Sequence, residues 1–163
     1  MSESRHELIV VALKAALASI VGDSGTTYWY TPDRVLRAPA FSAMCLDSSM
    51  DTIYVLSPED VGDERADSCS AKALVRVDLT AVHRFNPPTE NPFQQEDPIR
   101  WTVQTRLERD IKKLIRTDET LGGLSQEVRI PLTSYSPDET YFEGWACIFA
   151  RLEIKYHYPK ATP

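Results

Sequence analysis

The chain has 163 residues, and its 24 acidic and 18 basic side chains give a formal net charge of −6. Hydrophobic residues make up 42% of it, an ordinary globular composition, and a chain of this length can bury a core without disulfide staples. The acidic balance argues against a domain that binds nucleic acid through phosphate contacts, because such domains present a basic face. We expect one domain spanning residues 1–163.

The cysteines predict neither a disulfide framework nor a zinc site. Cys45, Cys69 and Cys147 are odd in number, far apart and without a C-x-x-C pair, so reduced thiols in a reducing compartment are expected. No signal peptide is visible. The apolar-rich stretch at residues 8–21 is interrupted by Lys14 and is too short to span a bilayer. The sequence therefore predicts a soluble intracellular product with no membrane association.

The N-terminal segment predicts a helix from Arg5 to about Val21. Ser4 and Glu7 have the S-x-x-E spacing of a capping box, in which the serine side chain accepts from the backbone N–H three residues later. Apolar residues then recur at helical spacing, and Gly22 is the expected terminator. The apolar stripe comprises Ile9, Leu13, Ala16 and Ile20, with Leu17 and Val21 beside it.

The next segment predicts two short strands separated by a long loop. Thr26 to Tyr30 is rich in β-branched and aromatic residues and indicates a strand that Pro32 ends. Residues 31–51 mix proline, serine and small apolar residues, so we expect an irregular segment with an extended stretch at Phe41 to Leu46. Asp51 to Leu56 has the composition of a second strand.

The middle of the chain predicts one long strand between two loops. Glu59 to Ser70 is acidic and polar and indicates an exposed loop, within a loop region at about 57–70. Ala71 to Phe85 alternates apolar and polar residues over its whole length, which predicts an unusually long strand. Asn86 to Asp97 contains three prolines and has no periodicity, so a surface loop at 86–97 is expected.

A second helix is predicted from Pro98 to Thr117, because an aspartate precedes a proline at the first helical position. Glu108 lies within i,i+4 reach of Lys112. The predicted buried stripe contains Val103, Leu107, Ile111 and Leu114, and the solvated side contains Arg106, Arg109, Lys112, Lys113 and Arg116.

The C-terminal third predicts a turn and two strands. Gly122-Gly123 leads into a strand from Gln126 to Leu132, in which Val128, Ile130 and Leu132 share one face. Polar residues at 134–144 interrupt the sheet, and Trp145 to Tyr158 predicts a long final strand. The order of elements predicts an α+β fold, a mostly antiparallel β-sheet with two helices packed on one face.

The sequence offers little catalytic chemistry. It lacks the glycine-rich phosphate-binding motifs, the G-x-S-x-G elbow and the H-E-x-x-H metal motif. His83 and His157 are scattered, and the acidic residues around 47–67 lack the alternating pattern of a calcium loop. We therefore assign no catalytic, cofactor-binding or metal-binding residue and expect a protein that is not an enzyme. The alternative is a small α+β enzyme or ligand-binding module that uses His83, Cys69 and the acidic loop.

Aromatic and basic residues suggest an interface. Tyr28, Trp29 and Tyr30 are adjacent, and neighbouring strand residues face opposite sides, so they either form a strand covered on both faces or anchor a subunit contact. Phe149, on the polar face of the last strand, is likewise a candidate for a subunit contact. The solvated side of the second helix, notably Arg109 and Lys113, could meet an acidic neighbour or remain solvated.

The whole order of elements resembles the tail terminator, or tail completion, proteins of long-tailed bacteriophages. The features that carry the resemblance are the alanine-rich N-terminal helix before Tyr30-Thr31-Pro32-Asp33-Arg34-Val35, and the long strand before a proline-rich loop. They also include the amphipathic helix that ends in Asp118-Glu119-Thr120-Leu121-Gly122-Gly123-Leu124, and the final strand that ends in Leu152-Glu153-Ile154-Lys155-Tyr156. The regions at about 31–70 and 86–97 are longer than the compact pattern of that family.

The resemblance implies a structural virion protein that needs no cofactor. Such a protein, made in the host cytoplasm, forms a homohexameric ring at the head-proximal end of the tail. There it contacts the tail tube protein and the neck or connector protein, and the sheath if the tail is contractile. Six copies of a −6 chain would carry −36, which suits a lumen through which DNA passes without specific binding. The alternative within the same particle is another neck or head-completion protein.

Overall fold

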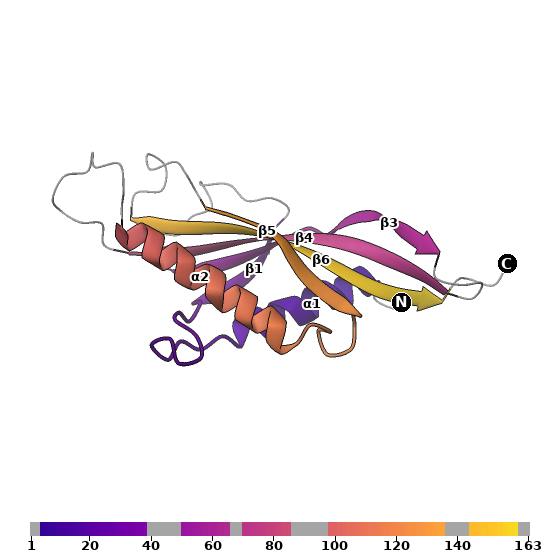
Figure 1. Ribbon diagram of the computed structural model, residues 1–163, viewed down its shortest axis with the longest axis horizontal. Coiled ribbons are helices and arrows are strands. Elements are labelled where there is room, and N and C mark those ends of the chain that lie inside the picture. The colour runs from indigo at the N-terminus through magenta and orange to yellow at the C-terminus, as the bar shows by residue number, and fades with distance from the viewer. Residues whose placement is uncertain (1–3, 39–49, 66–69, 86–97, 136–143, 160–163) are drawn as a thin grey trace.

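The computed structural model describes residues 4–38, 50–65, 70–85, 98–135 and 144–159. At its centre are two 15-residue strands, β4 (Ser70–Arg84) and β6 (Trp145–Pro159). They pair antiparallel over their whole length, from Ser70 opposite Pro159 to Arg84 opposite Trp145. The long alternating strands that the sequence predicts are therefore confirmed, and together they run along the long axis of the molecule (Figure 1).

Four shorter strands extend this pair into a six-stranded sheet. One flank of β6 carries β5, while the other flank of β4 carries β2 and then β3, with β1 outside β2. β1 pairs parallel with β2, and the other pairings among the described strands are antiparallel. The bounds of these strands are β1 Arg34–Ala38, β2 Thr52–Leu56, β3 Glu59–Arg65 and β5 Glu127–Tyr135.

Two helices, α1 (Arg5–Ala18) and α2 (Pro98–Thr117), cover the same face of the sheet (Figure 1). α1 lies over β1 and β2, and α2 lies over β5 and β6. Alternate apolar residues of β4 and β6 supply the floor of the core beneath them. This arrangement confirms the predicted α+β class with both helices on one face. The predicted stripe of α2 is buried, namely Val103, Leu107, Ile111 and Leu114.

The N-terminal cap forms as predicted, but the helix ends early. The backbone N–H of Glu7 donates to Ser4 Oγ at 3.2 Å. α1 stops at Ala18 rather than near Val21, which is left exposed. Gly22 is not the helix terminator. A Cβ added there would lie 2.8 Å from the Trp29 carbonyl oxygen, so the glycine instead permits two segments of backbone to approach closely.

Two predicted loops contain strands. β1 lies within the segment expected to be irregular, and β3 lies within the acidic segment expected to be a loop. Ser57-Pro58 does end β2, yet the chain continues along the same flank of β4, where Glu59 pairs opposite Arg76. An edge strand exposes its side chains to water, so acidic composition does not prevent pairing. The expected stretch at Phe41 to Leu46 and the loop at 86–97 lie outside the described residues.

The predicted strand at Thr26 to Tyr30 is wrong. Its one described bridge joins Gly22 and Tyr28, and the surrounding residues form a tight loop. Asp23 Oδ1 accepts from the backbone N–H groups of Thr27 and Tyr28 at 2.6 and 3.1 Å. A local side-chain acceptor thus replaces the sheet partner that β-branched and aromatic composition predicted.

β5 changes face part-way along, which overturns the predicted position of Leu132. The register of β5 on β6 shifts between Arg129 and Leu132, around Pro131. Such an extra residue transfers the following side chains to the opposite face. Val128 is accordingly buried against the helices, whereas Leu132 is 54% exposed on the other face of the sheet.

The Leu121-Gly122-Gly123 turn after α2 uses three consecutive left-handed residues, with φ of 49°, 68° and 85°. Asp118 holds this turn by accepting from the Thr120 N–H at 3.1 Å and the Gly122 N–H at 2.7 Å. These hydrogen bonds, led by that from the Thr120 hydroxyl, lower the pKa of Asp118. Leu121 tolerates its unfavourable φ because its side chain is buried in the core.

We predict that Gly122→Ala and Gly123→Ala each lower the free energy of unfolding by about 1 kcal/mol, because an L side chain disfavours positive φ. Both positions have open space for a Cβ, so the loss reports backbone conformation and not a clash. Urea denaturation measures it. Glu119→Ala, in the same exposed turn, is the control and should change stability little; equal losses in all three variants would contradict the explanation.

Candidate functional site

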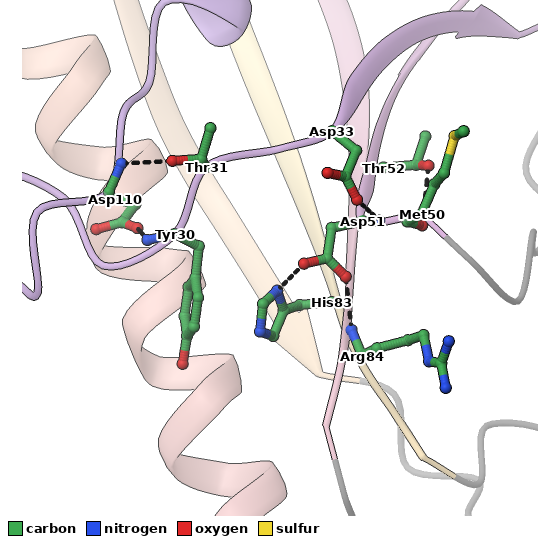
Figure 2. A network of polar contacts seen from close by, with 10 residues as sticks. Tyr30, Thr31, Asp33, Met50, Asp51, Thr52, His83, Arg84 and Asp110 are labelled. Atoms are coloured by element: carbon green, nitrogen blue, oxygen red, sulfur yellow. Dashed lines mark hydrogen bonds and ion pairs between the residues drawn. The ribbon is translucent and has the colours of Figure 1, made fainter.

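The aromatic segment at residues 28–30 is held against α2 by Asp110. The Trp29 N–H lies 2.9 and 3.0 Å from the two carboxylate oxygens. The Tyr30 N–H donates to Oδ2 at 3.0 Å (Figure 2). Asp110 is only 3% exposed. Burial raises its pKa above the ordinary value, although both backbone donors act in the opposite direction. The buried carboxylate thus serves as a clamp between the loop and the helix.

The ring of Trp29 lies between its own loop and α2. The Arg106 guanidinium carbon is 4.0 Å from the ring centroid, and a Cβ on Gly25 would fall 2.4 Å from a ring atom. Lys113 lies further along the same helix. Its Nζ is 5.8 Å from the Tyr28 ring centroid and 3.3 Å from the Thr26 carbonyl oxygen. Cation–π contacts of this kind favour aromatic rings packed on a basic helix.

Tyr28, Trp29 and Tyr30, the predicted interface candidates, are therefore half-buried by contacts within the chain. Of the predicted basic candidates, Lys113 joins this cluster and Arg109 is exposed beside it. Phe149 lies on the other face of the sheet, so the six candidates do not form one surface.

A polar network links this cluster to the sheet (Figure 2). The rings of Tyr30 and His83 have centroids 4.0 Å apart, and burial raises the Tyr30 pKa. His83 Nδ1 lies 2.5 Å from Asp51 Oδ2, an ion pair when the imidazole is protonated. Asp51 also accepts from the Arg84 N–H at 2.8 Å, and its own N–H donates to Asp33 at 2.7 Å. The network ties β4 to the starts of β1 and β2.

The cavity beside this network has a volume of about 20 Å³ and is lined by Tyr30, Asp51, His83 and Asp110 together with apolar side chains. A volume of this size holds about one water molecule. It therefore has no room for a metabolite. Cys69, which the enzyme alternative would pair with His83, lies outside the described residues.

Titratable groups outside this network do not indicate a catalytic site. Cys147 is fully buried, and burial raises its pKa to about 12, so it is not poised as a thiolate nucleophile. Within the described ranges, no group of three histidine, cysteine or acidic side chains is placed to hold a metal ion. In the same part of the chain, neither helix has the length and apolar character needed to cross a bilayer.

The exposed side of α2 is mainly basic, because Asp110 is buried and Glu108 is held by contacts to its own helix and to β5. Burial alone would raise the pKa of Glu108, but three donors outweigh it and lower the pKa. They are Lys112 Nζ at 2.5 Å, Thr133 Oγ1 at 2.7 Å and the Tyr135 hydroxyl. Burial and the same carboxylate raise the Tyr135 pKa to about 12. The predicted Glu108–Lys112 pair is confirmed.

The face of the sheet opposite the helices carries an open groove of about 440 Å³. Arg151 donates to both carboxylate oxygens of Asp78 at 2.8 and 2.9 Å across its floor. Thr80 in the same floor is 1% exposed, and its hydroxyl has no partner among the described residues. Apolar side chains border these polar groups, namely Leu56, Leu132 and Phe149.

Sequence reasoning missed Asp110, Leu132 and Trp101, which is 60% exposed and packs edge-on against Tyr135 at 5.2 Å. Pro131 was the available signal for Leu132, because proline within a strand marks an edge or a bulge. No sequence signal marks Asp110, because its partners are backbone groups about 80 residues away in the chain.

No protein-family model matches the chain, and no curated protein matches it at a significant level.

We predict that Asp110→Ala lowers the free energy of unfolding by about 1–3 kcal/mol, because two partly buried backbone N–H groups lose their acceptor. Urea denaturation followed by tryptophan fluorescence measures the loss and the release of Trp29. Arg109→Ala, the exposed neighbour on the same helix, is the control. Unchanged stability of the Asp110 variant would contradict the clamp.

The stability difference between wild type and Asp110→Asn should also depend on pH. The folded-state pKa of Asp110 is raised, so the folded chain binds this proton more tightly than the unfolded chain. Wild-type stability relative to the variant should therefore fall as pH rises from the ordinary carboxyl pKa of 3.8 through the raised value. Urea titrations at several pH values between about 3.5 and 7 measure the difference. A difference that grows with pH would refute the raised pKa.

Proposed function

We propose that this chain is a structural virion protein that forms a ring, with six copies expected, at the head-proximal end of a bacteriophage tail. There it would end tail-tube polymerisation and join the tail to the neck. The proposal rests first on the order of elements and on the Asp118 to Leu124 turn. The α+β sheet with both helices on one face is consistent with them. Its partners would be further copies of itself, the tail tube protein and the neck protein.

The observation that most supports an assembling role is a sheet face that neither helix of the described residues covers. α1 and α2 both pack on one side, so the long β4–β6 pair presents its second face with the groove that contains Leu132 and Phe149. Leu132 is 54% exposed, and the buried Thr80 hydroxyl in the same groove has no partner within the described part of the chain. Apolar side chains around polar groups are typical of contact surfaces between subunits.

The sheet also has edges that suit cyclic assembly. β5 is one edge of the described sheet, and β1 and β3 form the opposite edge. Two different edges on one molecule favour head-to-tail contacts, and such contacts give a closed ring when the rotation between copies closes. The protein would then act through its shape. One side of its ring would fit the last ring of the tail tube, and the other side would not bind a further tube ring.

Native mass spectrometry of the purified chain tests the proposal. We expect a closed species of six 18.4 kDa copies, about 110 kDa in total, and a ring with a central opening in negative-stain images. A monomer at every concentration up to saturation, or a bound small metabolite that copurifies with the chain, would exclude the proposed ring.

A substitution on the uncovered face provides a second test. We predict that Leu132→Arg weakens self-association by roughly tenfold or more, because it places an unpaired charge in the contact. Sedimentation velocity across a concentration series measures the effect. Val21→Arg is the control, since Val21 is 64% exposed in the loop after α1 and away from this face. Both variants should unfold at the wild-type urea concentration, and equal association of the two would remove the uncovered face from the assembly surface.

A further inference from the structure

α2 carries an excess of positive charge in an acidic protein. Six basic and two acidic residues give the helix a formal charge of +4, whereas the chain as a whole carries −6. Both acidic residues are withdrawn from solvent. Glu108 is held by Lys112, Thr133 and Tyr135, and Asp110 is buried against backbone N–H groups. Glu108 still pairs with Lys112, so the positive charge on the exposed side of the helix comes mainly from Arg109 and Arg116.

These residues border a shallow groove of about 400 Å³, which we call the basic groove. Arg109 and Arg116 are exposed, while Lys112 and Lys113 are half-buried. Thr105 and Glu108 complete its lining. A basic surface of this kind fits an acidic and extended partner segment, because lysine and arginine side chains on successive turns of the helix can reach its carboxylates.

β3 is a segment of that description. Four of its seven residues are acidic and one is basic, which gives a formal charge of −3. Among the described strands it pairs with β4 alone, so its other edge is open. A register shift between Asp60 and Gly62 leaves Val61 outside the pairing and 38% exposed. Bulges of this kind discourage strand addition, so recognition of β3 would proceed through its side chains.

The charges around β3 leave it available to a partner. Asp60 lies 3.0 Å from His6 Nε2, yet its side chain remains 70% exposed. Glu59 pairs in register with Arg76 and lies near Arg151. Those arginines already contact Glu153 and Asp78, at 3.6 and 2.8 Å. The β3 edge is therefore acidic, although the strands beside it carry both acidic and basic residues.

The basic groove and β3 of one copy lie on separate parts of the molecule. α2 packs on β5 and β6, whereas β3 lies across β4 toward one end of the long axis (Figure 1). We propose that the basic groove on α2 receives the acidic β3 edge of a second copy. This inference rests on the proposed ring and identifies the contact that closes it. Each copy would use both surfaces, one toward each neighbour, which is the head-to-tail arrangement a ring requires.

Charge reversal on each surface tests the contact. The groove variant is Arg109→Glu with Arg116→Glu, and the strand variant is Glu59→Lys with Asp60→Lys. Each alone should raise the concentration needed for half-maximal assembly by roughly tenfold or more, because like charges then face each other. Lys14→Glu on α1 is the control and should assemble as the wild type does. The variants Arg109→Ala and Arg116→Ala, with circular dichroism, separate lost contacts from lost folding.

Two rescue experiments make the test specific. Combining all four substitutions in one chain should restore the ring, because the reversed groove then matches the reversed strand. An equimolar mixture of the groove variant and the strand variant should also assemble, since each variant's groove complements the other's β3. Such a mixed ring must alternate, so it closes only with an even number of copies, as six would allow.

The possible outcomes separate the two proposals. If the wild-type chain forms a ring and both charge-reversal variants form it equally well, the groove-to-β3 contact is excluded. The contact is also excluded if neither rescue experiment restores assembly. In both cases the proposed ring itself is still supported. A wild-type chain that never assembles overturns both. Loss in each single variant with restoration in the combined chain establishes the contact, and sodium chloride at 0.5 M should then weaken the wild-type ring as well.

Discussion

The pairing of β4 with β6 is the constraint on which the rest of the structure depends. Fifteen residues of each strand face each other, although α2 and β5 separate the two strands in the sequence. Side chains alternate between faces with a period of two, so this register directs one apolar row from each strand toward the helices. α1 and α2 can bury their apolar sides only there. Slipping the register by one residue would turn the apolar row of one of the two strands to solvent.

The same alternation gives the sheet a second face with a different character. Opposite the apolar rows, charged residues of β4 and β6 meet as ion pairs, as Asp78 does with Arg151 and Arg76 with Glu153. The bulge in β5 adds Leu132 to this face and sends Thr133 and Tyr135 to the helix side, where they bind Glu108. One extra residue in an edge strand thus shapes both the uncovered sheet face and the exposed side of α2.

Buried carboxylates determine which charges remain on the surface. Asp110 accepts hydrogen bonds from the aromatic loop, and Glu108 accepts a hydrogen bond that joins α2 to β5. Both contacts are structural: Asp110 is buried against backbone N–H groups, and Glu108 compensates only Lys112 within the basic groove. The solvated side of α2, which the sequence predicts to be basic, presents Arg109 and Arg116 to solvent. The proposed contact between copies follows from this internal arrangement and from the acidic edge strand at the other margin of the sheet.

The sequence by itself determined the elements whose period extends over many residues. β4, β6 and α2 were predicted to within about a residue, because alternation over 15 positions or a helical stripe over 20 leaves little ambiguity. The fold class followed from their order. The position of Arg109 and Lys113 outside the buried stripe of α2 also followed from the helical period.

Tertiary structure alone decided the short elements and the details of the site. β3 exists because β4 offers it a free flank, and the aromatic segment is a loop because Asp110 and Asp23 satisfy its N–H groups in place of a neighbouring strand. Leu132 faces outward because of a bulge that no alternation pattern encodes. Asp110 is distant in the chain from the loop that it binds, and neither the acidic composition of β3 nor the alternation in β5 identifies the pairing that forms.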